Sequence, residues 1–205
     1  METNKKITGA CYYKNILTQQ HNDFQIIFRD LLENVKPKQI LEIGTGSGGL
    51  TLYLRECLNE LGLESTELVS YDINPTALME KLNSFPNTHI SNINLFSEDH
   101  EYTLIRYDLI ESYIQKNGTT IVMCDGGNKI KEFNQISKLL KPGDIIMCHD
   151  YCDTIENFNE KIFNKIWLWR EISDSDIQSS IDDYNLTPYY KEKFDSIVWG
   201  CFMRT

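Results

Sequence analysis

A chain of 205 residues, 41% of them hydrophobic, is long enough to form one domain with a substantial core. Its formal net charge of −10 disfavours a nucleic-acid partner, because an acidic surface repels phosphate backbones. None of the six cysteines forms a CxxC pair, which indicates free thiols in a reducing compartment. The N-terminus lacks the apolar segment of a signal peptide, and no apolar run reaches the ~20 residues of a membrane span. We therefore expect a cytoplasmic protein with no membrane partner.

Helical and strand patterns alternate along most of the chain. Helices are predicted at residues 20–35, 50–61, 76–84, 104–115 and 130–140. Strands are predicted at residues 39–43, 67–71, 89–96, 120–124 and 144–148. Strands separated by helices of about ten residues are typical of βαβ units. The sequence therefore predicts an α/β fold with a mostly parallel, doubly wound sheet.

The C-terminal part of the chain carries a different pattern. Two helices are predicted at residues 157–171 and 173–184, and two strands follow at 186–190 and 196–203. Two final strands with so short a connection indicate an antiparallel pair at one edge of the sheet. We expect Trp167, Trp169 and Trp199 to be core residues. Residues 1–205 are then one domain, with a helical lead-in over 1–36 and the sheet with its helices over 37–205.

The first predicted strand runs into a glycine-rich loop, LEIGTGSGG, at residues 41–49. Gly44, Gly46 and Gly49 match the dinucleotide pattern GxGxxG. Such a turn needs positive φ angles and a close approach of the ligand to the backbone, which a Cβ would block. Asp72 ends the second strand, where its carboxylate could accept both hydroxyls of a ribose or could cap the next helix. These features fit NAD and S-adenosylmethionine equally well.

Glu42 helps to distinguish between S-adenosylmethionine and NAD as the cofactor. A carboxylate two residues before the first glycine is poorly placed beside a pyrophosphate, but it suits a ligand with an α-amino group and a sulfonium charge. In addition, 205 residues leave no room for the separate substrate domain that dehydrogenases usually carry. The sequence therefore favours S-adenosylmethionine. An NAD-dependent oxidoreductase and a catalytically silent cofactor-binding module remain the alternatives.

Polar clusters follow the predicted strands at the point where each strand ends. They are Asp72, the segment at residues 96–99, Asp125, and the pair His149-Asp150. One Asp after a strand is commonly a cap or a turn residue, but four such ends are hard to assign to capping alone. Ligands of open parallel sheets bind at the carboxyl ends of the strands. We therefore expect the functional site at this edge of the sheet.

The segments LEIGTGSGG, SYDINP, CDGG and LLKPGDIIMCHDY occur in the order of the motifs of class I S-adenosylmethionine-dependent methyltransferases, and the chain resembles that superfamily over residues 20–152. Within it, the chain resembles the cephalosporin hydroxylase and rhamnosyl O-methyltransferase group, cousins of catechol O-methyltransferases. Gln20, Asp23 and Lys36-Pro37 resemble the lead-in of that group. The resemblance implies a Rossmann-like sheet, mostly parallel with an antiparallel C-terminal edge strand. It also implies methyl transfer to a hydroxyl of a small molecule or sugar.

The resemblance also assigns residues to the cofactor. It implies that the methionine end of S-adenosylmethionine lies at the glycine loop, at Glu42, Gly44, Thr45, Gly46 and Ser47. It implies that the rest of the cofactor lies at Asp72, Ile73, Phe96, Ser97, Glu98 and Asp125, with Asp72 at the ribose and residues 96–98 at the adenine.

Three residues are implied as ligands of a divalent cation. In metal-dependent relatives the position of Asp125 binds the cation, and His149 and Asp150 match the paired ligands after the fifth strand. Two carboxylates and an imidazole could hold Mg²⁺, or Mn²⁺ or Fe²⁺ because of the imidazole. Alternatively, His149 is the general base that takes the proton of the acceptor hydroxyl, or it is purely structural. The metal and the base remain open at this point.

Lys129 is a further candidate for a catalytic role. Catechol-type relatives place a catalytic lysine three residues after the Asp of strand four, where this chain has Asn128, with Lys129 next to it. We expect Lys129 to be a solvent-facing helix residue. The chain lacks the Asn/Asp-Pro-Pro-Tyr/Phe element of enzymes that methylate nucleic-acid amino groups. The acceptor pocket is expected from residues 7–13 and 151–159, and a homo-oligomer is compatible with the sequence.

Overall fold

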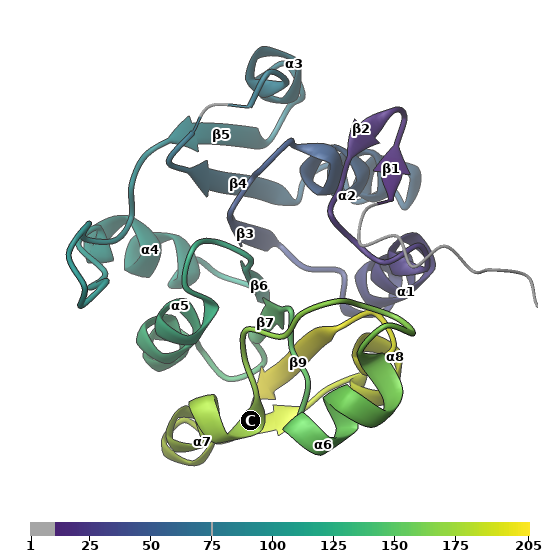
Figure 1. Ribbon diagram of the computed structural model, residues 1–205. Helices are drawn as coiled ribbons and strands as arrows, with labels where there is room; N and C mark the ends of the chain where they lie inside the picture. Colours follow the sequence, from purple (N-terminus) through teal and green to yellow (C-terminus); the bar gives the residue numbers. More distant parts are fainter. Residues whose placement is uncertain (1–10, 75) are drawn as a thin grey trace, which may run out of the picture.

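A seven-stranded sheet forms the centre of the computed structural model, which describes residues 11–74 and 76–205 (Figure 1). In sequence order its strands are β3 (Gln39–Ile43), β4 (Glu67–Asp72), β5 (Thr88–Asn92), β6 (Thr120–Cys124), β7 (Ile145–His149), β8 (Leu186–Pro188) and β9 (Trp199–Arg204). In space the order is β5-β4-β3-β6-β7-β9-β8. The first five strands are parallel, and β9 is antiparallel to both β7 and β8. This confirms the predicted doubly wound sheet with its antiparallel C-terminal edge.

The strand order reverses between β3 and β6. From β3 the chain proceeds outward through β4 to β5, and then it crosses back to β6 on the other side of β3. Ile43 at the end of β3 is in register with Tyr71 of β4 and with Cys124 of β6. The carboxyl ends of these three strands are therefore level, and the loops that follow them meet at the switch point where such sheets bind ligands.

Helices cover both faces of the sheet (Figure 1). One face packs against α4 (Tyr107–Ile114), α5 (Lys129–Ile136) and α7 (Asp174–Asp183), and the other against α1 (Phe24–Val35), α2 (Gly49–Glu60) and α8 (Lys191–Asp195). The short α3 (Met79–Asn83) lies beside β5, and a 3-10 turn, η1 (Ser137–Leu139), follows α5. Successive strand residues alternate between the faces: Leu41 belongs to the first core cluster and Ile40 to the second. Because both faces are covered, every residue of β3, β6 and β7 is buried.

The long helix predicted at residues 157–171 is wrong. The structure has a short helix, α6 (Ile155–Asn157), then a π-helical turn, η2 (Phe158–Ile162), and then irregular chain. Asn164 adopts a left-handed conformation with a φ of 57°, and the Trp167 indole N–H donates a hydrogen bond to Asp150. Trp167 and Trp199 are fully buried as expected, but Trp169 is 43% exposed and is not a core residue.

The structure corrects two further boundaries near the predicted site. The strand predicted to reach residue 96 ends as β5 at Asn92. The helix predicted to start at residue 20 begins at Phe24, and a small hairpin, β1 (Tyr12–Tyr13) and β2 (Ile16–Leu17), precedes it. This hairpin packs tightly on the start of α2, since a Cβ on Gly49 would lie 2.5 Å from the Leu17 carbonyl oxygen. Of the predicted acceptor segment, residues 7–10 lie outside the described residues.

All six cysteines are free thiols, and only Cys11 is partly exposed. Among the helices of the described residues, none is both long enough and apolar enough to cross a membrane.

Candidate functional site

A cavity of about 720 Å³ opens at the carboxyl ends of β3, β4 and β6. Its walls come from segments far apart in the sequence: residues 17–19, 43–47, 71–74, 92–98 and 125–127. Its volume lies within the range of pockets that hold cofactors and small ligands. The hairpin residues 17–19 form one side of the cavity, which the sequence pattern did not predict.

The glycine loop gives the cavity a bare backbone wall. Gly44 has a φ of 93°, and a Cβ there would lie 2.2 Å from the Asp125 carbonyl oxygen. Gly46 has a φ of 52°, and its nearest atom on the Cβ side is Gln19 Oε1 at 3.7 Å, so its Cα faces open space. Residue 44 must therefore be glycine because the backbone at the end of β6 approaches it closely. Glycine at residue 46 instead leaves room for a ligand.

Asp72 lies on the cavity wall in a fixed orientation. Its Oδ2 accepts a hydrogen bond from the Gly46 backbone N–H at 2.8 Å, and its Oδ1 accepts one from Asn74 N–H, also at 2.8 Å. Asp72 does not cap the following helix, because the N-cap of α3 is Leu78. Each carboxylate oxygen can accept a second hydrogen bond, so both remain able to accept from neighbouring hydroxyls of a ligand.

Glu42 lies beneath the glycine loop rather than on the cavity wall. It is 1% exposed, and its Oε2 accepts a hydrogen bond from the Thr51 hydroxyl at 2.6 Å. Burial raises the pKa of Glu42 from 4.5 to about 7, although the Thr51 hydrogen bond opposes this shift. Oε1 has no hydrogen-bond partner among the described residues. Glu42 therefore does not line the cavity, whereas the other predicted cofactor residues do.

An aromatic pair borders the opposite end of the cavity. The rings of Phe96 and Tyr102 stack with their centroids 4.5 Å apart and their planes 10° apart. Tyr102, which was not among the predicted site residues, lines the cavity together with Phe96, Ser97 and Glu98. Its hydroxyl donates a hydrogen bond to Glu132 at 3.1 Å, which holds the ring in place. This end offers a flat apolar surface of the kind that stacks on a purine base.

The charge on the cavity wall distinguishes between the candidate cofactors. Three carboxylates line it, those of Asp72, Glu98 and Asp125. Among the described residues of the wall there is no lysine, arginine or histidine. A pyrophosphate would meet negative charge without a cationic partner, whereas a sulfonium and an α-amino group would be attracted. The cavity therefore disfavours NAD and favours S-adenosylmethionine.

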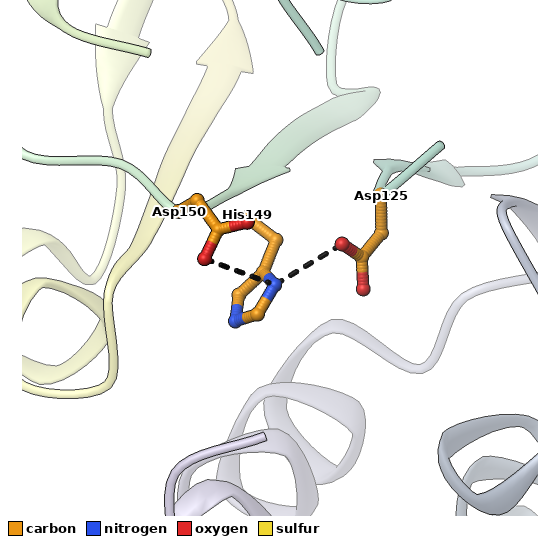
Figure 2. Close-up of side chains that lie close together, drawn as sticks. All are labelled: Asp125, His149 and Asp150. Carbon is orange, nitrogen blue, oxygen red and sulfur yellow. Dashed lines mark hydrogen bonds and ion pairs between the residues drawn. The ribbon is translucent and has the colours of Figure 1, made fainter. Parts of the chain in front are cut away.

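Asp125, His149 and Asp150 meet beside this cavity (Figure 2). Asp125 follows β6 and His149 ends β7, and these two strands are paired in parallel with Cys124 opposite Cys148. The Nδ1 atom of His149 lies 3.1 Å from Asp125 Oδ1 and 3.7 Å from Asp150 Oδ1. Figure 2 shows the other ring nitrogen pointing away from both carboxylates. Only Asp125 of the three lines the cavity.

Buried N–H groups fix the two carboxylates. Gln20 Nε2 donates a hydrogen bond to Asp125 Oδ2 at 3.2 Å, and Gln20 Oε1 in turn accepts one from the Trp199 indole at 2.7 Å. The Trp167 indole donates to Asp150 Oδ1 at 2.6 Å. The two tryptophans were predicted to be core residues only. Their side chains are buried, but each also takes part in the hydrogen-bond network of the site.

Lys129 completes the cluster, and the prediction that it faces solvent is wrong. Its side chain is 7% exposed, and its Nζ lies 2.8 Å from Glu171 Oε2, 3.3 Å from Asp150 Oδ2 and 3.8 Å from Asp125 Oδ1. Burial alone would lower the pKa of Lys129, but the three carboxylates outweigh burial and raise the pKa above its usual value. Lys129 is therefore a buried ammonium ion at neutral pH.

The carboxylates beside His149 favour its charged form. Burial alone would lower its pKa, but the Asp125 and Asp150 carboxylates outweigh burial and raise the pKa above 6.5. Its Nδ1–H can then donate to Asp125. Nε2 has no hydrogen-bond partner among the described residues, and the ring packs against Trp167 and Trp199 with centroid distances of 5.4 and 4.9 Å.

The strand order and the acidic cavity at the switch point together define the class: this is a class I S-adenosylmethionine-dependent methyltransferase. More particularly, the chain belongs to the FtsJ-like methyltransferase family, whose model matches residues 14–166. A search of curated proteins by sequence finds no match.

Solved structures share the fold at low sequence identity. The apo-structure of CmcI is similar with a TM-score of 0.63 and 16% identity, over 95% of this chain and 76% of that chain. The Mg-SAM structure of CmcI gives a TM-score of 0.60 and 14% identity, with the same coverage of 95% and 76%. An O-methyltransferase family protein from Burkholderia thailandensis gives 0.53 and 9%, over 87% of this chain and 55% of that chain.

Proposed function

We propose that this enzyme transfers the methyl group of S-adenosylmethionine to a hydroxyl oxygen of a small molecule or sugar. One observation carries the proposal: Asp125 lies on the wall of the cofactor cavity and is hydrogen-bonded to a buried imidazole behind it. A carboxylate in that position can accept the proton of a hydroxyl at the moment of methyl transfer. The likeness to an O-methyltransferase family protein supports the same chemistry.

The described residues fit the cofactor. The open Cα of Gly46 and the carboxylate of Asp72 suit the methionine portion and the ribose, and the Phe96–Tyr102 pair suits the adenine. The proposed contacts with the cofactor come from Gly44, Thr45, Gly46, Ser47, Asp72, Ile73, Phe96, Ser97, Glu98 and Asp125. Glu42 supports the glycine loop from below through its hydrogen bond with Thr51.

The bound cofactor supplies an electrophilic methyl group on a sulfonium that leaves as a neutral thioether. Asp125 accepts a hydrogen bond from the acceptor hydroxyl and takes its proton as the new O–CH₃ bond forms. His149 is a positioning residue in this scheme, because it is 3% exposed and its Nδ1–H faces Asp125 rather than the cavity. Gln20 holds the second oxygen of Asp125, so that Oδ1 and Oδ2 keep fixed directions.

A divalent cation does not fit this cluster as the side chains are arranged. Asp125, His149 and Asp150 offer three donor atoms within 4.8 Å of one another, and water or substrate would have to supply the other ligands of a divalent cation. However, His149 Nδ1 already lies within hydrogen-bond distance of Asp125 Oδ1, at 3.1 Å, so these two donor atoms are paired with each other. The Lys129 ammonium also lies against both carboxylates. We therefore derive no step of the reaction through a metal.

The acceptor is proposed to be small and uncharged or cationic, because the cavity wall is acidic. A nucleic-acid acceptor is disfavoured for the same reason. We also propose that the chain acts as one domain, with the hairpin and α1 as a lead-in that covers one side of the cofactor.

A methyl-transfer assay on the purified protein tests this proposal. Transfer from labelled S-adenosylmethionine is measured on a panel of hydroxylated small molecules and sugars, and on a panel of amines for comparison. Hydroxyl methylation that is lost in Asp125→Asn supports the proposal. Transfer to amines only, or hydroxyl methylation that is unchanged in Asp125→Asn, would refute it.

A further inference from the structure

The ammonium group of Lys129 lies at the centre of the acidic cluster. Lys129 is the first residue of α5, and besides its three carboxylate neighbours it donates a hydrogen bond to the Gly126 carbonyl oxygen at 3.3 Å. A lysine ammonium has three N–H donors and no acceptor. Its four oxygen neighbours among the described residues can accept from these three N–H groups.

The local sequence explains why residue 129 takes this position. Asn128 is the N-cap of α5, and its side chain accepts a hydrogen bond from the Lys131 backbone N–H at 3.1 Å. The cap orients residue 128 toward its own helix, so the following residue carries the side chain that turns back to Asp125 and Asp150.

The oxygens that a metal would use are the ones that face Lys129. Asp125 Oδ2 already accepts from Gln20, and Asp150 Oδ1 already accepts from Trp167. The other two oxygens, Asp125 Oδ1, which also faces His149 Nδ1, and Asp150 Oδ2, are those nearest Lys129 Nζ. A divalent ion bound to these two oxygens would lie beside a buried ammonium, where like charges repel strongly because the dielectric is low.

We propose that Lys129 is the resident cation of this site, taking the place of a divalent metal, so that methyl transfer by this enzyme needs no metal. The part of this inference that concerns methyl transfer rests on the proposed function. Lys129 offsets part of the negative charge of Asp125, Asp150 and Glu171, and its ion pairs help to hold the first two carboxylates in place. Lys129 acts through Asp125 and is therefore a positioning residue.

Binding of Mn²⁺, measured by electron paramagnetic resonance, tests this inference directly. The wild-type protein is titrated with Mn²⁺ in the absence and in the presence of S-adenosylhomocysteine, and we expect no saturable site in either case. The Lys129→Met variant keeps the length of the side chain but removes its charge, so we expect it to gain one saturable Mn²⁺ site. Lys131→Met on the same helix is the matched control, and Lys129→Arg retains the charge. Both should bind no Mn²⁺.

Two results would overturn the inference. One is a saturable Mn²⁺ site in the wild-type protein that is lost in Asp150→Asn. The other is a folded Lys129→Met protein that takes up no Mn²⁺. The wild-type titration decides the question even where Lys129→Met does not fold. Because this readout needs no methyl transfer, it is independent of the proposed function, which fails separately if the enzyme methylates no hydroxyl with EDTA present or with Mg²⁺ added.

Discussion

The carboxylate of Asp125 and the imidazole of His149 contact each other across the ends of two neighbouring strands, with 3.1 Å between Oδ1 and Nδ1. Asp125 alone of the two lines the cavity, while His149 is buried against Trp167 and Trp199. The site therefore places one group where an acceptor can reach it and uses the other to hold the first in position.

Replacing Asp125 by Asn should reduce kcat much more than it weakens cofactor binding. The amide keeps the size of the side chain but cannot accept the proton of a hydroxyl, and removal of a general base typically costs about 100-fold or more in rate. Single-turnover methyl transfer and calorimetric binding of S-adenosylhomocysteine measure the two effects separately. Asp182→Asn on the exposed side of α7 is the control. Equal kcat values for wild type and Asp125→Asn would contradict the role given to Asp125.

Replacing Asp72 by Ala should weaken cofactor binding more than it lowers kcat at saturation. The carboxylate offers charged hydrogen bonds to the ligand and also orients the Gly46 N–H. Loss of a hydrogen bond to a charged group costs about 1.5–3 kcal/mol, which corresponds to roughly 10- to 150-fold in the dissociation constant. Calorimetry with S-adenosylhomocysteine gives this ratio. An unchanged dissociation constant would place the ribose elsewhere.

Gly44→Ala should destabilise the protein far more than Gly62→Ala. Both glycines have positive φ angles, 93° and 71°, so an alanine is strained at either position. At Gly62 there is no atom within 4 Å of the new Cβ among the described residues, whereas at Gly44 it would lie 2.2 Å from the Asp125 carbonyl oxygen. We expect a loss of about 1 kcal/mol at Gly62 and of at least about 3 kcal/mol at Gly44. Urea denaturation at one pH measures both, and equal losses would show that the close approach of the two strand ends is unimportant.

Glu42 should make stability depend on pH. Burial raises its pKa in the folded protein from 4.5 to about 7, so between these values the native state holds a proton that the unfolded chain has lost. Stability therefore falls as the pH rises from about 4.5 through 7, by up to about 3 kcal/mol from this residue. In Glu42→Gln this part of the pH dependence should disappear. Denaturation midpoints of both proteins at pH 5 and pH 8 supply the comparison, and parallel pH profiles would contradict the prediction.

The fold could be predicted from the sequence because its signals are local. The buried runs at residues 39–43 and 120–124 became β3 and β6 with the predicted bounds. Regular βα alternation then specifies a parallel sheet. The segment at residues 157–171 was misread because its apolar spacing resembles a helix, whereas contacts with distant Asp150 decide its course. A hydrogen bond between residues 17 positions apart leaves no periodic trace in the sequence.

The candidate site was predictable at the strand ends and not behind them. The glycine loop, Asp72 and Asp125 follow directly from strands, so their meeting at one sheet edge follows from the topology. The links of Gln20 to Asp125 and of Lys129 to Glu171 span 105 and 42 residues. Such contacts depend on tertiary packing. For Lys129 in particular, a charged residue in the first turn of a helix is usually exposed, so burial could not be inferred from its position.

Calorimetric titration of the wild-type protein with S-adenosylhomocysteine, with NAD⁺ as the comparison, tests the nature of the cavity most directly. Because three carboxylates and no cationic side chain line the described wall, we expect saturable binding of S-adenosylhomocysteine and no heat of binding with NAD⁺. Saturable binding of NAD⁺ without binding of S-adenosylhomocysteine would contradict the assignment of this cavity to methyl transfer.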